Sequence, residues 1–227
     1  MSKHIDNGLE YEINGNKATL LGFASSSRFA INQIPNMVIP DIVRGVPVTK
    51  IAQHAFEKVD EIETVTIPST LTEIGTCAFL GCQHLETIRM SCPMSKKDIL
   101  RICASAFAYC FCLNEIDIFC TLEIESRAFL GCDKLSKLSG IIILVEANAF
   151  RDCHRIYMLN LQHNANVGFY AFQNCTIENI RCLGDIILSE SDMRELINNN
   201  TMVYCYTDSK TADLAYCGVA ISCKSRS

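Results

Sequence analysis

Cysteine is the residue type in this chain with the most potential for chemistry, because 14 of the 227 residues are cysteine. A thiolate can bind a metal ion, form a disulfide or attack an electrophile. Zinc sites usually draw their ligands from two closely spaced pairs, but no C-x-x-C motif occurs here, and Cys110 and Cys112 form only a C-x-C. His154 follows Cys153 directly and should point to the opposite side of the chain. The sequence therefore predicts no metal site.

The histidines give no stronger indication of catalysis. None of them lies in a motif of a serine hydrolase, a zinc protease or a phosphate-binding loop. Paired acids and a dinucleotide fingerprint are also missing from the sequence. We therefore expect a protein that is not an enzyme and has no cofactor. The five scattered histidines are His4, His54, His84, His154 and His163.

Five of the cysteines occupy the same position in an internal repeat. The dipeptide Ala-Phe occurs six times at intervals of 21 to 28 residues, and the third residue after each Phe is Val59 in the first copy and cysteine in the others. An apolar residue also stands four residues before each Ala, and further apolar columns follow the cysteine, which gives the pattern I-x-x-x-A-F-x-x-C-x-x-L-x-x-I-x-I. The five cysteines of this column are Cys82, Cys110, Cys132, Cys153 and Cys175.

The repeat indicates how the chain must fold to place this column. Apolar residues two apart in L-x-x-I-x-I suit a short strand with one buried face. A unit this short cannot bury that face alone, so stacked copies should form a parallel β-ladder and a continuous core, which is a repeat solenoid. We expect A-F-x-x-C to make a short helical or 3₁₀ turn. The six Phe residues should form one buried column: Phe56, Phe79, Phe107, Phe129, Phe150 and Phe172.

The cysteine column is predicted to hold thiols and not disulfides. Adjacent rungs of a ladder lie about 4.8 Å apart with parallel Cα–Cβ bonds, whereas a disulfide needs Cβ atoms about 3.5–4.5 Å apart on converging bonds. Val59 in the first copy indicates that the position requires a small apolar group, which is how a buried thiol behaves.

A family resemblance rests on the same residues. Residues 67–85 include Ile67-Pro68-Ser69, Ile74-Gly75, Ala78-Phe79 and Gly81-Cys82, followed by Leu85. This motif resembles the BspA-like (Treponema-type) leucine-rich repeat family over about residues 34–188. The resemblance implies a leucine-rich-repeat solenoid that acts as an adhesion or protein-interaction module on a cell surface.

The two ends should be capped, since the end rungs of a solenoid expose a core face. We predict one domain, 1–227, with an N-terminal β-hairpin cap at 8–33, repeats at 34–188 and a C-terminal α/β cap at 189–223. The turn Asn14-Gly15-Asn16 predicts the hairpin. The C-terminal cap should contain a helix at 189–199, a strand at 202–206, a second helix at 209–216 and a strand at 219–223. Residues 91–101 should form an inserted loop.

The outward residues of L-x-x-I-x-I should form two parallel files across the ladder. In one interpretation a protein partner docks on this face. In the other, the charges of neighbouring rungs only neutralise one another. The residues of the two files, which are the predicted protein-binding residues, are Thr64, Thr66, Thr87, Arg89, Glu115, Asp117, Lys137, Ser139, Met158, Asn160, Asn179 and Arg181.

Three classes of function therefore remain open. The protein could bind a partner through the ladder face, build a larger assembly as a structural subunit, or use its thiols for redox or metal chemistry. A formal net charge of −5 argues against nucleic acid, and no apolar run is long enough for a transmembrane segment. The family resemblance implies the cell surface or secretion, whereas the absence of a signal peptide and the many unpaired thiols favour the cytoplasm.

Overall fold

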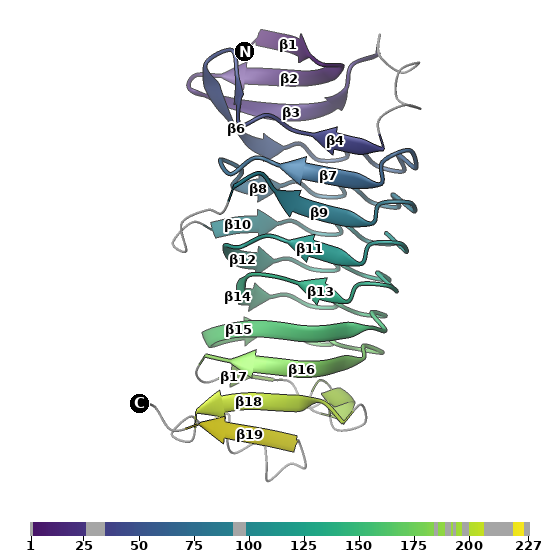
Figure 1. Ribbon diagram of the computed structural model, residues 1–227, viewed down its shortest axis with the longest axis vertical. Coiled ribbons are helices and arrows are strands. Elements are labelled where there is room, and N and C mark those ends of the chain that lie inside the picture. The colour runs from purple at the N-terminus through teal and green to yellow at the C-terminus, as the bar shows by residue number, and fades with distance from the viewer. Residues whose placement is uncertain are drawn as a thin grey trace.

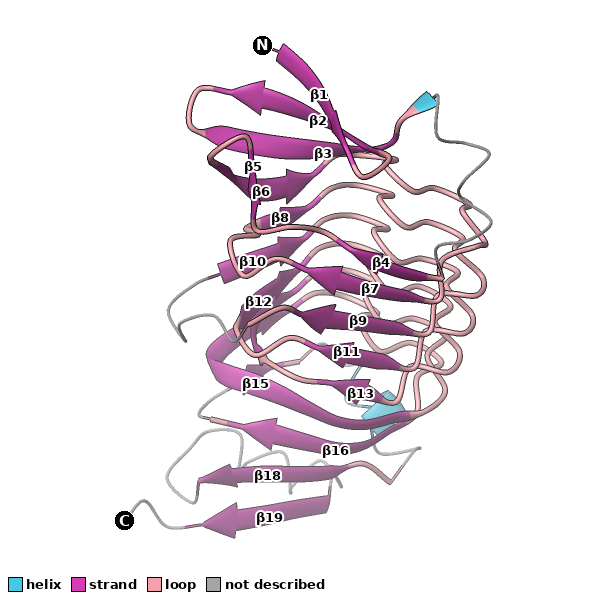
Figure 2. Ribbon diagram, turned by 45° about the horizontal axis from the view of Figure 1, so that its top comes forward, coloured by secondary structure: helices cyan, strands magenta, loops and turns pink. Residues whose placement is uncertain are grey.

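The chain winds into stacked coils along one long axis, with one coil for each Ala-Phe pair (Figure 1). The computed structural model describes residues 2–25, 35–92, 99–183, 186–188, 192, 194–196, 200–206 and 220–224. Each coil contributes a strand to a first ladder, a strand to a second ladder and a turn that closes the coil (Figure 2). The predicted repeat solenoid with a parallel β-ladder is confirmed.

The first ladder is the one that L-x-x-I-x-I predicts. Its strands pair in parallel from coil to coil, and the apolar residues Val65, Ile88 and Ile116 point inward and are fully buried. The strands are β4 (Asn36–Val38), β7 (Thr64–Ile67), β9 (Thr87–Met90), β11 (Glu115–Asp117), β13 (Lys137–Leu138), residues 156–161 of β15 (Ile156–Val167), β16 (Ile177–Cys182), β18 (Met202–Tyr206) and β19 (Ala220–Lys224).

A second parallel ladder, which was not predicted, carries the apolar residue four positions before each Ala. Its strands are β3 (Lys17–Phe23), β6 (Val46–Ile51), β8 (Glu73–Ile74), β10 (Ile99–Ile102), β12 (Thr121–Ile124), β14 (Ile141–Val145), residues 165–167 of β15, and β17 (Ile186–Ile187).

The predicted inserted loop at 91–101 is too long. β10 begins at Ile99 and is one of the strands of the second ladder, whereas residues 93–98 lie outside the described residues.

The A-F-x-x-C segments form turns and not the helical or 3₁₀ segments that we predicted. In the first coil, His54 and Lys58 adopt left-handed backbone angles (φ +57° and +55°), which interrupt any helix. The N–H groups of His54, Phe56 and Lys58 donate to carbonyl oxygens of the next coil at 2.7–3.0 Å. The N–H groups between them bond within the turn. The next four coils repeat this pattern, so hydrogen bonds along the axis join the turns.

The predicted phenylalanine column is confirmed. All six rings are fully buried, and successive rings stack with centroids 5.2–6.0 Å apart. Phe23 of β3 meets the first of them, Phe56, edge-on at 5.2 Å. The column therefore forms one continuous aromatic core from the N-terminal sheet to Phe172.

The N-terminal hairpin is confirmed: β2 (Leu9–Asn14) pairs antiparallel with β3 through the predicted turn. An unpredicted strand, β1 (Ser2–Asp6), adds to its outer edge, and β5 (Ile42–Val43) pairs antiparallel with β6. At the other end, residues 192 and 194–196 are helical, and β18 and β19 match the two predicted strands. The second predicted helix, 209–216, lies outside the described residues.

Candidate functional site

The structure brings the predicted outward residues into two files on the first ladder. One file runs through Thr64, Thr87, Glu115, Lys137, Met158 and Asn179, each opposite the next in parallel register. The other file contains Thr66, Arg89 and Asp117, and further along the ladder Asn160 and Arg181. Ser139 should lie between these two groups, but β13 ends at Leu138, so Ser139 is not paired in the ladder. Thr87 is only 7% exposed, so it offers little surface to a partner.

In the middle of this face, charges of opposite sign pair with one another. The Lys137 ammonium forms ion pairs with Glu115 and, at 3.7 Å, with Asp117, and Ser139 Oγ donates a hydrogen bond to Asp117 Oδ1 at 3.2 Å. The hydrogen bond to Glu115 raises the pKa of Lys137 above its ordinary value. These charges fit the interpretation in which rungs compensate one another, and such exposed pairs contribute little to stability.

Two cations of the same face, Arg89 and Arg181, form no ion pair with the residues that the structure describes. Arg89 and Arg181 are exposed, and within the described residues no carboxylate lies at ion-pair distance from either guanidinium. Asp117 is opposite Arg89 in register, yet its carboxylate pairs with Lys137. Positive charge therefore remains available to a partner on both sides of the neutralised centre.

The second ladder differs in this respect. Its outward file alternates in sign through Lys50, Glu73, Arg101 and Glu123. Lys50 pairs with Glu73 at 2.7 Å, and Arg101 pairs with Glu123 at 3.2 Å. In the described part of the second ladder, each of these four charges thus has an opposite partner within the same face.

The corner between the two ladders becomes shorter over three successive coils, from β11 to β15. Seven residue steps lead from Glu115 to Leu122, five from Lys137 to Ile142 and three from Met158 to Leu161, although each of these pairs is in register with the next. The corner around Phe119 therefore projects beyond the one in β15, where the strand passes straight through.

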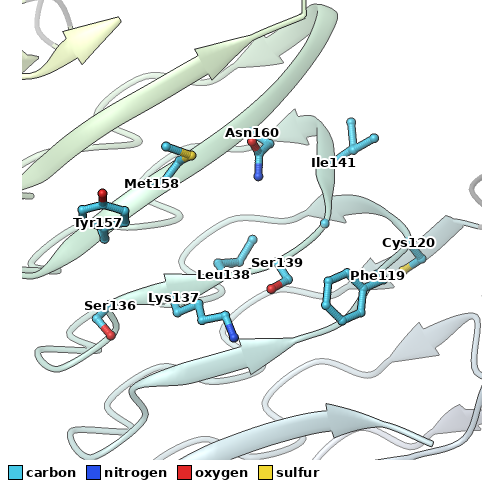
Figure 3. Close-up of a pocket in the computed structure, with 11 residues that line it drawn as sticks. Phe119, Cys120, Ser136, Lys137, Leu138, Ser139, Ile141, Tyr157, Met158 and Asn160 are labelled. Carbon is cyan, nitrogen blue, oxygen red and sulfur yellow. The ribbon is translucent and has the colours of Figure 1, made fainter. Parts of the chain in front are cut away.

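A pocket of about 370 Å³ opens where this corner recedes. In Figure 3, Tyr157 and Phe119 lie on opposite sides of Leu138 and Ser139. Both aromatic side chains are exposed, at 59% and 55%. Four of the predicted site residues, Lys137, Ser139, Met158 and Asn160, line the pocket, and the remaining lining residues are Phe119, Cys120, Ser136, Leu138, Gly140, Ile141 and Tyr157.

Gly140 is required for this shape. Its φ is +119°, and a Cβ there would lie 2.9 Å from the Ile118 carbonyl oxygen and 3.0 Å from that of Cys120. Glycine lets the β13–β14 connection pass close beneath the previous coil, which leaves space on the side of β15. The sequence alone does not indicate Gly140, Phe119 or Tyr157, since none of them lies in a repeat column.

The cysteine column is a row of hydrogen-bonded thiols. Cys82, Cys110, Cys132 and Cys153 are buried and form no disulfides. Each Sγ lies 3.0–3.1 Å from the carbonyl oxygen of a Phe in the preceding coil, to which its S–H donates. Burial raises the pKa of the Cys82 thiol to about 12 and that of Cys132 well above its ordinary value. The column is therefore built for packing and not for reactivity.

We expect these thiols to resist labelling in the native protein. A rise in pKa from 9 to about 12 lowers the thiolate fraction about a thousandfold. With iodoacetamide at pH 8 and mass-spectrometric readout, Cys82, Cys110, Cys132 and Cys153 should react at least about a hundredfold more slowly than the exposed Cys92. Denaturant should abolish the difference, and equal rates in the native protein would contradict the assignment.

The substitution Cys132→Val should lower the free energy of unfolding by less than about 1 kcal/mol. The valine matches Val59 of the first coil, and the Phe107 carbonyl oxygen keeps the backbone N–H of Cys110 as a donor at 3.2 Å. Urea unfolding measures the change. The control Cys132→Leu adds volume and should cost about 1–3 kcal/mol. A loss above about 2 kcal/mol for Cys132→Val would indicate a bond or ligand at the thiol.

The described residues contain no cluster of three or more His, Cys, Asp or Glu side chains placed to hold a metal ion. His154, beside the buried Cys153, is exposed and contacts Asp133. Among the described helices, none has the length and apolar character that a membrane crossing requires.

Stacked coils with parallel ladders and an inward column of apolar residues define a solenoid of the leucine-rich-repeat type. The particular family follows from the sequence, which matches the BspA type leucine rich repeat region in six copies at residues 25–143 and 95–192. The chain belongs to this family.

One solved structure shares the fold over most of this chain. A leucine rich cell surface protein from Faecalibacterium prausnitzii superposes with a TM-score of 0.63 at 21% identity over 81% of this chain. This chain spans about half of that protein, 49% of its length. A leucine-rich repeat protein from Bacteroides ovatus matches 96% of this chain and 66% of its own, with 14% identity and a TM-score of 0.44. The search of curated proteins gave no match.

Proposed function

We propose that this protein is a non-enzymatic binding module that docks a protein partner on the face of the first ladder. The observation that carries the proposal is the contrast between the two faces. The first ladder presents a pocket and two arginines, Arg89 and Arg181, that have no ion pair with any described residue, whereas the charged file on the second ladder is neutralised within itself. Positive charge on one face favours partners with a negatively charged surface and speeds their association.

Rigidity supports the same proposal. The strands are held by neighbours on both sides, and every coil packs on the stacked Phe column, so the face is organised before a partner arrives. A preorganised surface loses less conformational entropy on binding. We also propose that the chain is one domain with caps at 8–33 and 189–223 around the repeats at 34–188. The F. prausnitzii relative is a cell surface protein, and adhesion at a surface is the setting we propose.

The test is affinity capture with the 227-residue chain and quantitative mass spectrometry. The double variant Arg89→Glu and Arg181→Glu should lose proteins that the wild type enriches, because it reverses both available cations. The control Lys50→Glu and Arg101→Glu makes the same change in net charge on the second ladder. Circular dichroism verifies that both variants are folded.

The outcomes separate the proposed role from the alternative. Partners that are lost only in the first-ladder variant support docking on that face. Partners that are lost only in the second-ladder control would overturn it and favour a structural subunit that packs through its other face. Equal capture by the wild type and both double variants would also contradict docking on the first ladder.

A further inference from the structure

We infer that the pocket between β13 and β15 receives one large apolar side chain of a peptide segment whose neighbouring carboxylate pairs with Arg181. This inference rests on the proposed function, since it specifies the chemistry of the partner at the same face. It follows from the shape of the pocket, the exposed aromatic side chains beside it and the distribution of charge around it.

The apolar part of the ligand follows from the residues that form the pocket. Leu138 is almost fully buried at its base, and the Met158 and Ile141 side chains add apolar surface (Figure 3). Phe119 and Tyr157 are more than half exposed although they are large. A volume of about 370 Å³ lies within the range of sites that bind small ligands, about 300–1,000 Å³. An aromatic or large aliphatic side chain would cover both exposed rings.

The charged part of the ligand follows from the cations of this face and from the carboxylates that the described residues place beside them. Lys137 lines the pocket, but its ammonium is directed to Glu115 and Asp117 of the preceding coil. Arg181 is opposite the pocket residue Asn160 in parallel register, one strand spacing of about 4.8 Å away. Within the described residues its guanidinium has no carboxylate partner. A carboxylate beside the apolar anchor can therefore form a bidentate pair with Arg181.

The arrangement has the character of an interaction hot spot. A central apolar anchor that fills a pocket, next to an arginine, carries most of the binding energy at many interfaces. The carboxylate is expected on the β16 side of the anchor, because the β11 side already holds the carboxylates of Glu115 and Asp117. The ligand class is thus an acidic peptide segment with one aromatic or large aliphatic residue.

The experiment is a selection of displayed random 12-residue peptides on the immobilised 227-residue chain. One enriched peptide is then labelled with fluorescein, and its affinity is measured by fluorescence anisotropy. The enriched peptides should share a large apolar residue within two positions of Asp or Glu. Asn160→Trp, which fills the pocket, and Arg181→Gln should each weaken binding about tenfold or more.

Matched controls lie outside the predicted binding residues. Val38→Trp introduces the same ring at an exposed position of β4, opposite Thr66 and far from the pocket, and Arg127→Gln removes an exposed arginine from a turn outside the first ladder. Both should change the affinity less than about threefold. Thermal unfolding verifies that all four variants are folded.

Three results would overturn the inference: no peptide enriched above background, basic residues in place of the acidic one, or an affinity that Asn160→Trp leaves unchanged. In those cases the affinity capture separates the two proposals. If capture of proteins is still lost in the Arg89→Glu and Arg181→Glu variant, the first ladder remains the docking face and only the role of the pocket is wrong. If capture is unchanged in that variant, both proposals are wrong.

Discussion

Phe129→Ala is expected to lower the free energy of unfolding by about 3–5 kcal/mol. The Phe129 ring is fully buried and stacks between Phe107 at 5.5 Å and Phe150 at 5.3 Å. Its removal leaves a cavity in the middle of the column, and the rings on each side lose a stacking partner. The rings are fixed by turns that hydrogen-bond to both neighbouring coils, so the cavity cannot close easily. Urea unfolding followed by circular dichroism measures the loss.

The control for this prediction is Phe119→Ala. Phe119 is 55% exposed at the rim of the pocket, so its truncation should change stability by no more than about 0.5 kcal/mol. A similar loss for the two variants would contradict the continuous core. Such a large loss at Phe129 would be a major part of the roughly 5–15 kcal/mol that stabilises a typical domain.

Gly22→Ala is expected to cost about 2–4 kcal/mol, the second largest of these effects. Gly22 has φ +130°, a conformation that L-residues rarely adopt, and a Cβ there would lie 2.4 Å from the Ala55 carbonyl oxygen. This close approach seats the N-terminal sheet on the first turn, where Phe23 meets Phe56. The alanine would strain the backbone and push the sheet away from the first coil. The measurement is again urea unfolding.

Gly15→Ala provides the comparison. Gly15 also has a positive φ, +61°, but no atom lies within 4 Å of the position of its Cβ. It should therefore show only backbone strain, about 1 kcal/mol. Equal losses at Gly15 and Gly22 would mean that the contact with Ala55 does not hold the sheet in place.

The first ladder and the aromatic core could be predicted because each depends on a repeated residue type. The Phe and Cys columns recur at fixed distances from each other, and stacking identical units puts identical side chains above one another. The two outward files follow from the alternation of a strand. The registers Thr87↔Glu115 and Glu115↔Lys137 agree with this expectation.

The second ladder could not be recognised in the same way. Its β8 is two residues long and has a single inward residue, Ile74, from which no alternation can be read. β10 and β12 do alternate, with Leu100 and Ile102 buried in one and Leu122 and Ile124 in the other, but this spacing does not recur in every coil. The turns were misjudged for a related reason, since the left-handed positions hold chemically unlike residues such as His54, Tyr109 and Asp152.

The pocket could not be predicted from the sequence, because each coil with a shorter corner has additional residues elsewhere and keeps nearly the same length. The distance in sequence is nine residues from Glu115 to Ile124, eight from Lys137 to Val145 and nine from Met158 to Val167. Register shifts in β14 and β15 absorb the residues that the corner loses. A nearly constant repeat length therefore conceals a change of shape, and only pairing in three dimensions reveals it.

The hydrogen bonds that join successive turns have a mechanical consequence. These bonds, like those of the two ladders, run along the long axis, so a force that pulls the ends of the solenoid apart acts along the bonds and not across them. The coil at one end can then detach while the next remains intact. A coil of 22 residues, the interval from Phe107 to Phe129, would release about 7 nm of extended chain. Under tension the solenoid is therefore expected to lengthen in steps of one coil.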